Sequence, residues 1–456
     1  MTEERTGENA ERRDRRISSR IVSNATWLTG GRIFTLVVGT GVVLIAARYL
    51  GPTEFGRYSY AVALVLLFAE VADLGLRGII TRDLVAQPSS RDEILGSAFV
   101  VRITGGAAAV GMVLGSISVL RPGDSELQLM VLILSAGVIL QPMRIVDLFY
   151  ESELRSRYTV LSDAVATAVW FGLVALVVPF GYGSTWLSGA KGVHIGLGAL
   201  ILIAVFARQG WRPLRWRFEL TRARLMLRQS WPLAISSIGV AIYLKIDQVM
   251  LGEMLGDREV GIYAIAAQLS EASYFLPAVI ASSIFPSLVL LKKTDEIGYG
   301  LRLQRSFNFL AWFAIATSIL IVWLADDVVE LVFGDEYGAS AVILSVHIWA
   351  SVFVYMRTVL SRWLIIEELY VFSLVTHGAG ALVNVLANLL LIPPLKGVGA
   401  AIATVVSYAT ASYFALFFHR STKDAGVMMT KALAWPFLQL SGWIARSKSA
   451  RNDLEG

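Results

Sequence analysis

The stretch that decides the organisation of this chain occurs twice. Residues 50–61 read LGPTEFGRYSYA, and residues 255–266, 205 positions later, read LGDREVGIYAIA. The two copies share six of twelve positions, and each follows the first long apolar segment of its half of the chain. Two short loops could have converged on this pattern, because Gly readily adopts positive φ and Tyr favours membrane interfaces. Six shared positions favour an internal duplication, which in transporters places the transport path between the two halves.

The composition is that of an integral membrane protein. Of the 456 residues, 55% are hydrophobic and 16% are charged, whereas soluble domains have about 25% charged residues. The chain has no cysteine, which excludes disulfides, thiol catalysis and cysteine metal sites. The net charge of +5 would suggest a nucleic-acid partner in a soluble protein. In a membrane protein it reflects the orientation rule for loops, so we expect no nucleic-acid partner.

The apolar runs predict an all-α protein with about twelve membrane-spanning helices, because a span needs roughly 20 mostly apolar residues. The predicted spans occupy residues 21–48, 58–81, 94–119, 127–149, 158–180, 186–207, 230–252, 260–291, 305–325, 339–363, 369–393 and 398–419. They form two six-helix bundles at 21–207 and 230–419, joined by a basic, Trp-containing cytoplasmic linker at 208–229. Residues 1–20 are an Arg-rich polar tail, disordered or interfacial, without the apolar core of a cleavable signal.

The basic residues orient the predicted spans. By segment, 30 of the 40 Lys and Arg residues lie on the side of the N-terminus, six on the opposite side and four within spans. This bias predicts cytoplasmic termini and supports an even number of spans. The C-terminal tail at 420–456 contains an apolar run at 432–445 that is too short to cross a bilayer. Its Trp residues and flanking bases predict an interfacial helix, with a short buried contact as the alternative. Pro277 and Pro286 predict a kink in the eighth span.

The sequence shows no motif of a soluble enzyme. Residues 397–401 read GVGAA, but they lie between two apolar spans and lack the strand–turn–helix context of a dinucleotide loop. Close helix packing is the better interpretation of these small residues. The histidines, at 194, 347, 377 and 419, do not have the spacing of metal ligands. We therefore predict no catalytic residue, no metal site and no cofactor.

Charges inside the predicted spans are the candidate functional residues, because a charge there is costly and usually faces the bundle interior. They are Arg32 in span one, Glu70, Asp73 and Arg77 in span two, Arg102 in span three, Asp163 in span five, Lys245 and Asp247 in span seven, and Glu271 in span eight. The spacing of Glu70, Asp73 and Arg77 predicts one shared helix face, on which Asp73 and Arg77 can neutralise each other. Ion pairs between helices are the structural alternative for the whole set. Arg357, near an end of span ten, is expected to extend to the interface.

Arg32 and Lys245 are the strongest candidates for ligand binding. Neither has an acidic residue three or four positions away in its own helix, and Asp247, two positions from Lys245, points to a different face. Cations that line a cavity suit a phosphate-bearing substrate. Because the acids within the spans nearly balance the cations, a uniformly positive cavity is not predicted.

Several short motifs resemble those of bacterial and archaeal polysaccharide flippases. Residues 47–58, ARYLGPTEFGRY, resemble the first-loop signature of that family, and residues 73–76, DLGL, its second-span motif. The other matches are KIDQVMLG at 245–252 with EVGIY at 259–263, FP at 285–286 and GVGAAIAT at 397–404. Their order and spacing extend the resemblance from the first span to the last.

The resemblance implies the fold of the multidrug/oligosaccharidyl-lipid/polysaccharide exporter superfamily. In that fold two six-helix bundles, related by a pseudo-twofold axis along the membrane normal, enclose a V-shaped central cavity lined by spans one, two, seven and eight. The substrate-binding candidates are then Arg32, Asp73, Lys245 and Asp247. The remaining charges are candidates for ion coupling or structure, namely Glu70, Arg77, Arg102, Asp163 and Glu271. The repeat glycines, Gly51, Gly56, Gly256 and Gly261, are expected to permit tight reversals at the outer turns.

The implied function is transport of a polyprenyl-diphosphate-linked oligosaccharide from the cytoplasmic to the outer leaflet of the cell membrane, for an O-antigen or exopolysaccharide. The implied partners are membrane lipids, a polysaccharide polymerase and glycosyltransferases. A proton or sodium gradient coupled through Asp73 or Asp247 and product removal outside are the alternative energy sources. A cation-coupled drug exporter of the same fold and a membrane glycosyltransferase or ligase are the other functions considered. Short external loops disfavour the ligase.

Overall fold

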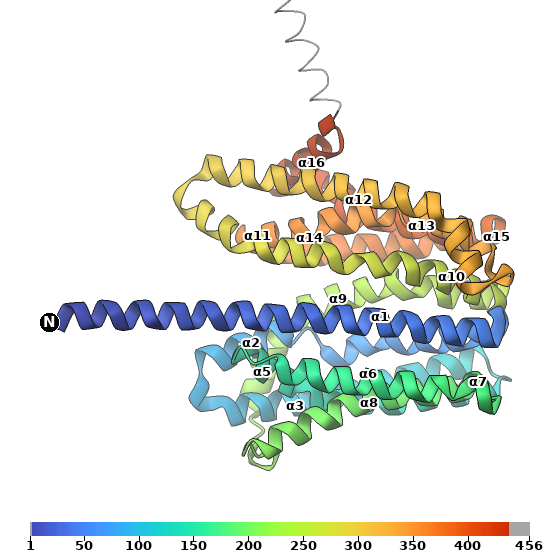
Figure 1. The fold of residues 1–456 in the computed structure, drawn as a ribbon, viewed down its shortest axis with the longest axis horizontal. Helices are drawn as coiled ribbons and strands as arrows, with labels where there is room; N and C mark the ends of the chain where they lie inside the picture. The colour runs from blue at the N-terminus through green and yellow to red at the C-terminus, as the bar shows by residue number, and fades with distance from the viewer. Residues whose placement is uncertain (1, 437–456) are drawn as a thin grey trace, which may run out of the picture. The chain divides into compact units, whose positions relative to one another are not determined.

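The computed structural model describes the backbone of residues 2–436 and, from residue 23 onward, their side chains except at 282, 283 and 370. Every regular element in this described part is a helix, as the sequence predicts (Figure 1). The predicted interfacial helix at 432–445 falls largely outside the described residues.

The helices belong to two compact units that divide between Ala264 and Ile265. Unit 1 contains α1 (Thr2–Asp73), α2 (Arg77–Ala86), α3 (Arg91–Leu120), α4 (Ser125–Ile139), α5 (Ile145–Ser152), α6 (Arg157–Ala175), α7 (Val177–Phe180), α8 (Ser184–Arg208), α9 (Leu220–Leu255) and the start of α10 (Asp257–Glu271). Unit 2 contains the rest of α10, α11 (Phe275–Thr294), α12 (Glu296–Phe333), α13 (Ala339–His347), α14 (Ala350–Ile366), α15 (Tyr370–Ser412) and α16 (Arg420–Leu433). Within unit 1, α1 packs along α3, α6 and α9.

Helix α1 combines the predicted N-terminal tail with the first predicted spans. Its backbone is helical from Thr2, which fits the many Glu and Arg residues of the tail because both are strong helix formers. The helix is broken at Gly51, where φ is 70° and ψ is 173°. Pro52 then opens the next helical stretch, a position at which its missing N–H and restricted φ are tolerated.

Ten helical segments of the described residues are long and apolar enough to cross a membrane, so the chain is a multi-pass membrane protein. Two of these segments, Ser23–Ala86 and Val371–Phe418, have non-helical backbone near their middle, at Gly51 in the first and at Lys396 in the second. The predicted count of twelve spans requires each of the two to cross the membrane twice. That count, the predicted bundle boundaries and the pseudo-twofold symmetry stay predictions.

The predicted eighth span is interrupted by a 3-10 turn at Ala272–Tyr274 between α10 and α11. Pro277 lacks the N–H that would donate to the carbonyl of Ser273, four residues earlier. The hydroxyl of Tyr355 in α14 donates to that carbonyl instead, at 3.0 Å. The side chain thereby satisfies a buried backbone group that the proline leaves without a helical partner.

Helix α16 lies in the segment that the sequence predicts as tail. One face of it packs against α12 in a hydrophobic cluster that includes Ala425, Met429 and Ala432. The indole Nε1 of Trp312 donates to the carbonyl of Ala432 at 3.0 Å. The helix is amphipathic and short, so a search for long apolar runs does not find it.

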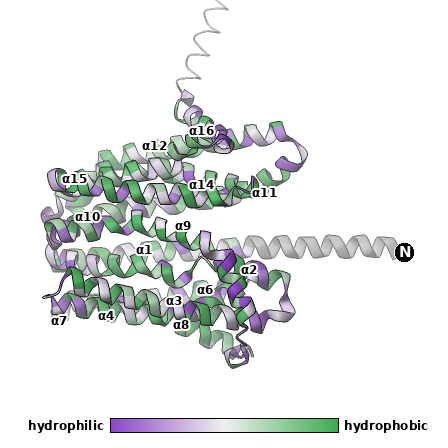
Figure 2. Cartoon of the chain, turned by 180° about the vertical axis from the view of Figure 1, so that it is seen from behind, coloured by the Kyte–Doolittle hydropathy of each residue, from purple (hydrophilic) through white to green (hydrophobic). Residues whose placement is uncertain are grey.

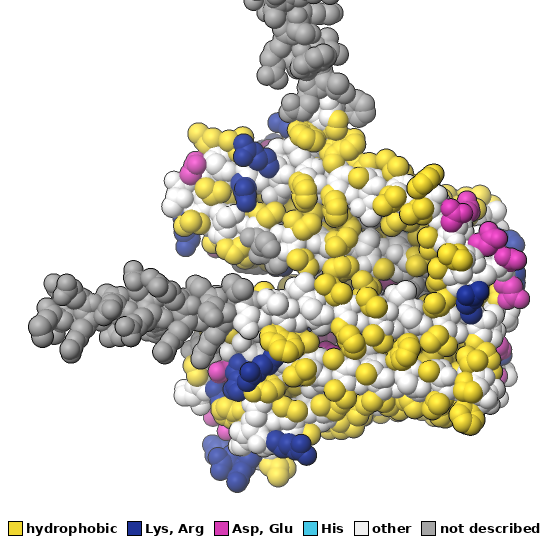
Figure 3. All heavy atoms as spheres, in the orientation of Figure 1, with side chains coloured by type: hydrophobic (Ala, Val, Ile, Leu, Met, Phe, Trp, Pro, Cys, Tyr) yellow, Lys and Arg dark blue, Asp and Glu magenta, His cyan; other side chains and the backbone are white. Residues whose placement is uncertain are grey.

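The surface of each unit is apolar along the helices. Hydrophilic residues concentrate toward helix ends and connecting segments (Figure 2), and on the face seen in Figure 3 hydrophobic side chains cover the middle of each unit. Large apolar side chains are far more exposed than in a soluble core, for example Trp323 at 76% and Leu390 at 74%. Such a surface is stable where hydrocarbon replaces water.

Candidate functional site

All four predicted substrate-binding residues lie on α1 and α9 of unit 1, two helices that pack against each other. Arg32 is an exposed residue of α1 and has no hydrogen-bond or ion-pair partner among the residues that the structure describes. Lys245 on α9 is half-buried. Asp73 and Asp247 have partners on other helices, which the sequence does not predict.

Asp73 pairs with Arg102 of α3. The guanidinium Nη2 of Arg102 lies 2.7 Å from Oδ1 of Asp73, and Arg102 is 8% exposed. Asp73 is the last residue of α1, and the helix stops there because Leu74 and Gly75 have positive φ values of 49° and 64°. A Cβ at Gly75 would overlap the backbone of α9 at Leu233–Ala234, so glycine also allows the two helices to approach closely.

This interruption corrects the predicted shared face of Glu70, Asp73 and Arg77. Arg77 opens the next helix, α2, and pairs with Glu151 of α5 at 2.8 Å, with both side chains exposed. Glu70 lies beside Ser237 of α9. The three residues therefore contact three different helices, and Asp73 and Arg77 do not neutralise each other.

Asp247 is 2% exposed and accepts a hydrogen bond of 2.7 Å from the hydroxyl of Tyr263 in α10. Tyr263 is the tyrosine of the second repeat copy. This bond connects α9 to α10 across Gly256 and satisfies part of the hydrogen-bonding capacity of a buried carboxylate, which would otherwise be costly.

Asp163 belongs to a charge cluster that the sequence analysis missed. Arg144 donates through Nη1 and Nη2 to the two carboxylate oxygens of Asp163, at 2.6 and 3.1 Å. The same guanidinium contacts Asp147 through Nε at 2.8 Å. Arg144 and Asp147 lie three positions apart near the end of predicted span four, a spacing that could have identified the pair. One arginine thus ties α5 to α6 inside unit 1.

Two further charges lie in unit 2. Glu271 is half-buried near the end of α10. Arg357 is 8% exposed and donates to the Ala411 carbonyl at 2.7 Å, to the Thr376 hydroxyl at 2.9 Å and to Nε2 of His377 at 2.7 Å. The prediction that Arg357 extends to the interface is therefore wrong, because its side chain is buried and groups of α15 accept hydrogen bonds from both of its terminal nitrogens. Within the described residues, no group of three or more His, Asp and Glu residues is placed to hold a metal ion.

The repeat glycines have two different structural roles. Gly51 and Gly256, at equivalent positions of the two copies, adopt nearly the same conformation, with φ of 70° and 94° and ψ of 173° and 174°. Both are helix breaks at positive φ, where glycine is tolerated best. Gly56 and Gly261 were predicted at turns as well, but they lie inside helices α1 and α10.

Gly56 and Gly261 bring the two repeat copies into contact. A Cβ at Gly56 would overlap the carbonyl of Asp257, and a Cβ at Gly261 would overlap the carbonyl of Pro52. Pro52 and Asp257 occupy equivalent positions of the two copies, as do the two glycines, so the contact is reciprocal. We call this backbone-to-backbone packing the repeat contact. It lies within unit 1.

These features define a helical multi-pass membrane protein with charges inside its spans and a duplicated sequence motif. A family model described as "Polysaccharide biosynthesis protein" matches residues 21–291, and the chain belongs to that family. It is 23% identical over 381 residues to the "Probable low-salt glycan biosynthesis flippase Agl15" of Haloferax volcanii, covering 80% of this chain and 76% of that protein.

Two solved structures show the fold. One is an inward-facing multidrug resistance MATE family transporter of the MOP superfamily, with a TM-score of 0.70 and 13% identity over 89% of this chain and 95% of that one. The other is the lipid II flippase MurJ in an inward closed conformation, with a TM-score of 0.66 and 13% identity over 91% of this chain and 92% of that one. The chain therefore has the fold of the superfamily that the sequence motifs predict.

Proposed function

We propose that this protein flips polyprenyl-diphosphate-linked oligosaccharides from the cytoplasmic to the outer leaflet, for the biosynthesis of a polysaccharide. Membership of the polysaccharide biosynthesis family and the similarity to a named glycan flippase support this function. The structural observation that carries it is Arg32, an exposed cation on a membrane-spanning helix that has no partner among the described residues. Charges within membrane spans usually face the bundle interior or a water-filled cavity, and a diphosphate is an anion that an arginine there can bind.

Transport is needed because the glycan cannot cross hydrocarbon unaided. Its hydroxyl groups would lose their hydrogen bonds to water. A polar cavity can replace that water while the polyprenyl tail stays in the bilayer. The two predicted six-helix bundles would rock so that the cavity faces each side in turn. No covalent bond is made or broken in this cycle, so the protein acts as a transporter and not as an enzyme.

The proposed orientation places both termini in the cytoplasm and the protein in the cell membrane. The excess of basic residues on the N-terminal side supports it. A reporter fused after Arg228 is expected to be cytoplasmic, and one inserted at Gly334 is expected to be external. The opposite result at either site would overturn the orientation or the span count. A polymerase and glycosyltransferases that use the same lipid carrier would act on either side of the flipping step.

A cation-coupled drug exporter is the second candidate, because the fold is also that of a multidrug transporter. The carboxylates that could couple an ion already have partners, Arg102 for Asp73 and Tyr263 for Asp247. Ion coupling through either carboxylate would have to share it with that partner. A gene deletion separates the two functions. Loss of a flippase causes lipid-linked repeat units to accumulate facing the cytoplasm, whereas loss of a drug exporter lowers drug resistance and leaves surface glycan normal.

Arg32 provides the test at the level of a residue. Arg32→Lys keeps the charge and loses the planar fork, so partial export is expected, whereas Arg32→Ala is expected to lose most export. Lys245→Ala is expected to impair export, and Lys245→Arg less so. Membrane abundance is measured beside export for each variant, because a structural role would lower abundance. Full export by a well-expressed Arg32→Ala, Lys245→Ala double variant would exclude a cationic binding site.

A further inference from the structure

Arg121, in the connection between α3 and α4, contacts both sides of the repeat contact. Its Nε lies 2.8 Å from Glu253 of α9, and its Nη2 lies 2.6 Å from the carbonyl of Gly252 and 3.2 Å from Asp257 of α10. Its guanidinium carbon lies 5.1 Å from the ring centroid of Tyr60 in α1. One side chain therefore joins α1 and the α3–α4 connection to the break between α9 and α10.

The charge of Arg121 suits the helix ends that it contacts. A cation is favourable beside the carbonyl at the C-terminal end of α9, and Asp257 is favourable at the N-terminal end of α10. Burial lowers the pKa of Arg121, but the hydrogen bond to Glu253 and the charge of Asp257 raise it above its ordinary value. The guanidinium thus stays charged. Tyr60 also contacts a partner of Arg121, because its hydroxyl donates to Glu253 at 2.8 Å.

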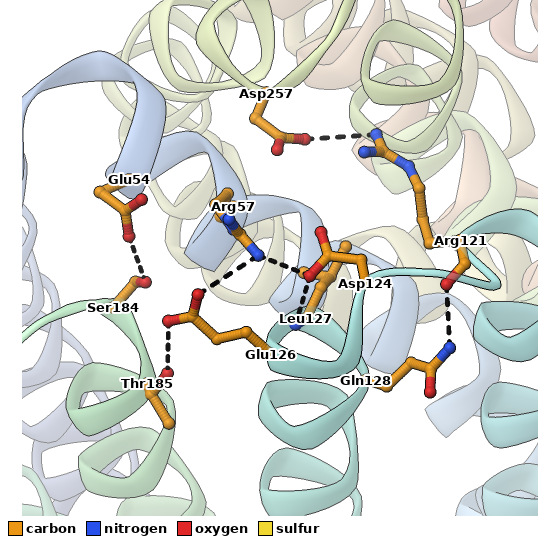
Figure 4. Close-up of polar contacts among 10 residues, drawn as sticks. All are labelled: Glu54, Arg57, Arg121, Asp124, Glu126, Leu127, Gln128, Ser184, Thr185 and Asp257. Carbon is orange, nitrogen blue, oxygen red and sulfur yellow. Dashed lines mark hydrogen bonds and ion pairs between the residues drawn. The ribbon is translucent and has the colours of Figure 1, made fainter.

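Arg57 supports a second set of contacts at this end of unit 1 (Figure 4). Its Nη2 lies 2.6 Å from Asp124 and 3.5 Å from Glu126. Asp124 also accepts from the backbone N–H of Leu127 at 3.0 Å and caps the start of α4. The contacts of Arg57 connect α1 to the start of α4. The contacts of Arg121 connect the α3–α4 connection to α9 and α10.

We propose that Arg121 holds closed a gate formed by the repeat contact, and that the transport cycle opens this gate by breaking its contacts. The inference rests on the proposed function, which requires the cavity to face each side in turn. Charged side chains suit this purpose better than further apolar packing would. Polar groups that water reaches on opening keep hydrogen-bond partners in both states, so the free-energy difference between open and closed stays small.

The gate can be tested without any substrate. The chain has no cysteine, so Val249→Cys introduces the single thiol. Val249 is 6% exposed and lies on α9 three residues before Gly252, near the same helix face. The rate at which a water-soluble maleimide labels this thiol, in purified full-length protein in lipid nanodiscs, reports how often the gate opens.

Adding Arg121→Ala to Val249→Cys is expected to raise the labelling rate by about tenfold, because charge-assisted hydrogen bonds of the closed state are lost. With Arg121→Lys, the labelling rate is expected to lie between that of Val249→Cys alone and that of Val249→Cys with Arg121→Ala. Lysine keeps the charge but lacks the planar fork of the guanidinium. Arg48→Ala is the matched control. Arg48 is an exposed arginine of α1 without a hydrogen-bond or ion-pair partner in the described part of the chain, so its removal is expected to leave the rate unchanged.

A second variant keeps the test decisive if Arg121→Ala does not fold. Glu253→Gln combined with Asp257→Asn removes both negative charges with little change in shape and is expected to accelerate labelling as well. A rate within twofold of the Arg48→Ala control, in whichever variant folds, would overturn the gate. Labelling does not depend on export. Faster labelling of the Arg121→Ala variant, with normal surface glycan in the deletion strain, would therefore refute the proposed function alone. Unchanged labelling, with accumulated lipid-linked repeat units in the deletion strain, would refute the gate alone.

Discussion

The Gly56→Ala substitution tests whether the repeat contact is as close as the structure shows. The added Cβ would overlap the backbone carbonyl of Asp257, and the backbone amide of Gly261 is also near. Backbone atoms cannot move aside as the end of a flexible side chain can, so the helices must separate or bend. Overpacking of this kind typically costs about 1–3 kcal/mol.

The matched control is Gly39→Ala, in the stretch of α1 before the break at Gly51, where a Cβ would have no neighbour within 4 Å. Alanine is favoured over glycine inside a helix by roughly 0.5–1 kcal/mol, and this gain applies to both substitutions. The difference between the two variants therefore isolates the overlap, and we expect Gly56→Ala to be less stable than Gly39→Ala by about 1–3 kcal/mol.

The assay is the apparent melting temperature of the purified protein in detergent, measured at one scan rate because unfolding of large proteins is often irreversible. Gly261→Ala is expected to behave like Gly56→Ala, since the contact is reciprocal. The double variant is expected to cost less than the sum, because the first substitution already separates the helices. A Gly56→Ala protein that melts at or above Gly39→Ala would refute the close backbone contact.

Two other substitutions test the buried charges. Arg102→Ala leaves the partly exposed Asp73 without its partner. We expect a loss of about 1–3 kcal/mol, seen as lower membrane abundance, and normal abundance would contradict a structural role for the pair. Tyr263→Phe removes the hydrogen bond to buried Asp247 and is expected to cost about 1–3 kcal/mol in thermal stability. Tyr58→Phe, at the equivalent position of the first copy, is the comparison, and equal melting temperatures would contradict the importance of the Asp247 bond.

The sequence predicts the fold class and the family because those depend on local properties. Apolar run length and charge content reveal a helical membrane protein, and the motif order reveals the superfamily. The helix break after Asp73 was not predictable in the same way. Leu74 is a residue that rarely adopts positive φ, and the close approach of α9 to Gly75 is a tertiary feature. The amphipathic helix α16 was missed because its apolar face is narrow and its mean hydropathy is low.

The partners of the charges could not be predicted because they lie on other helices. Arg102 pairs with Asp73, and Arg144 pairs with Asp163. In each pair the two residues belong to different predicted spans. A sequence shows that a charge lies in a span, but the packing of the helices decides whether an opposite charge reaches it. Counting charges in spans therefore overestimates the number of binding residues.

The charged residues of unit 1 differ in the partners that they contact. Asp73 and Asp163 have partners in the same unit, so they contribute to holding its helices together. At the repeat contact Arg121 joins the α3–α4 connection to α9 and α10, and the side chains of this contact are partly exposed. Arg32 has neither kind of partner among the described residues. In the proposed transport cycle, charges can have three roles: they can hold helices together throughout, separate in each cycle, or bind the substrate. The ion pair with Asp73 fits the first role for Arg102, and our proposals assign the second to Arg121 and the third to Arg32.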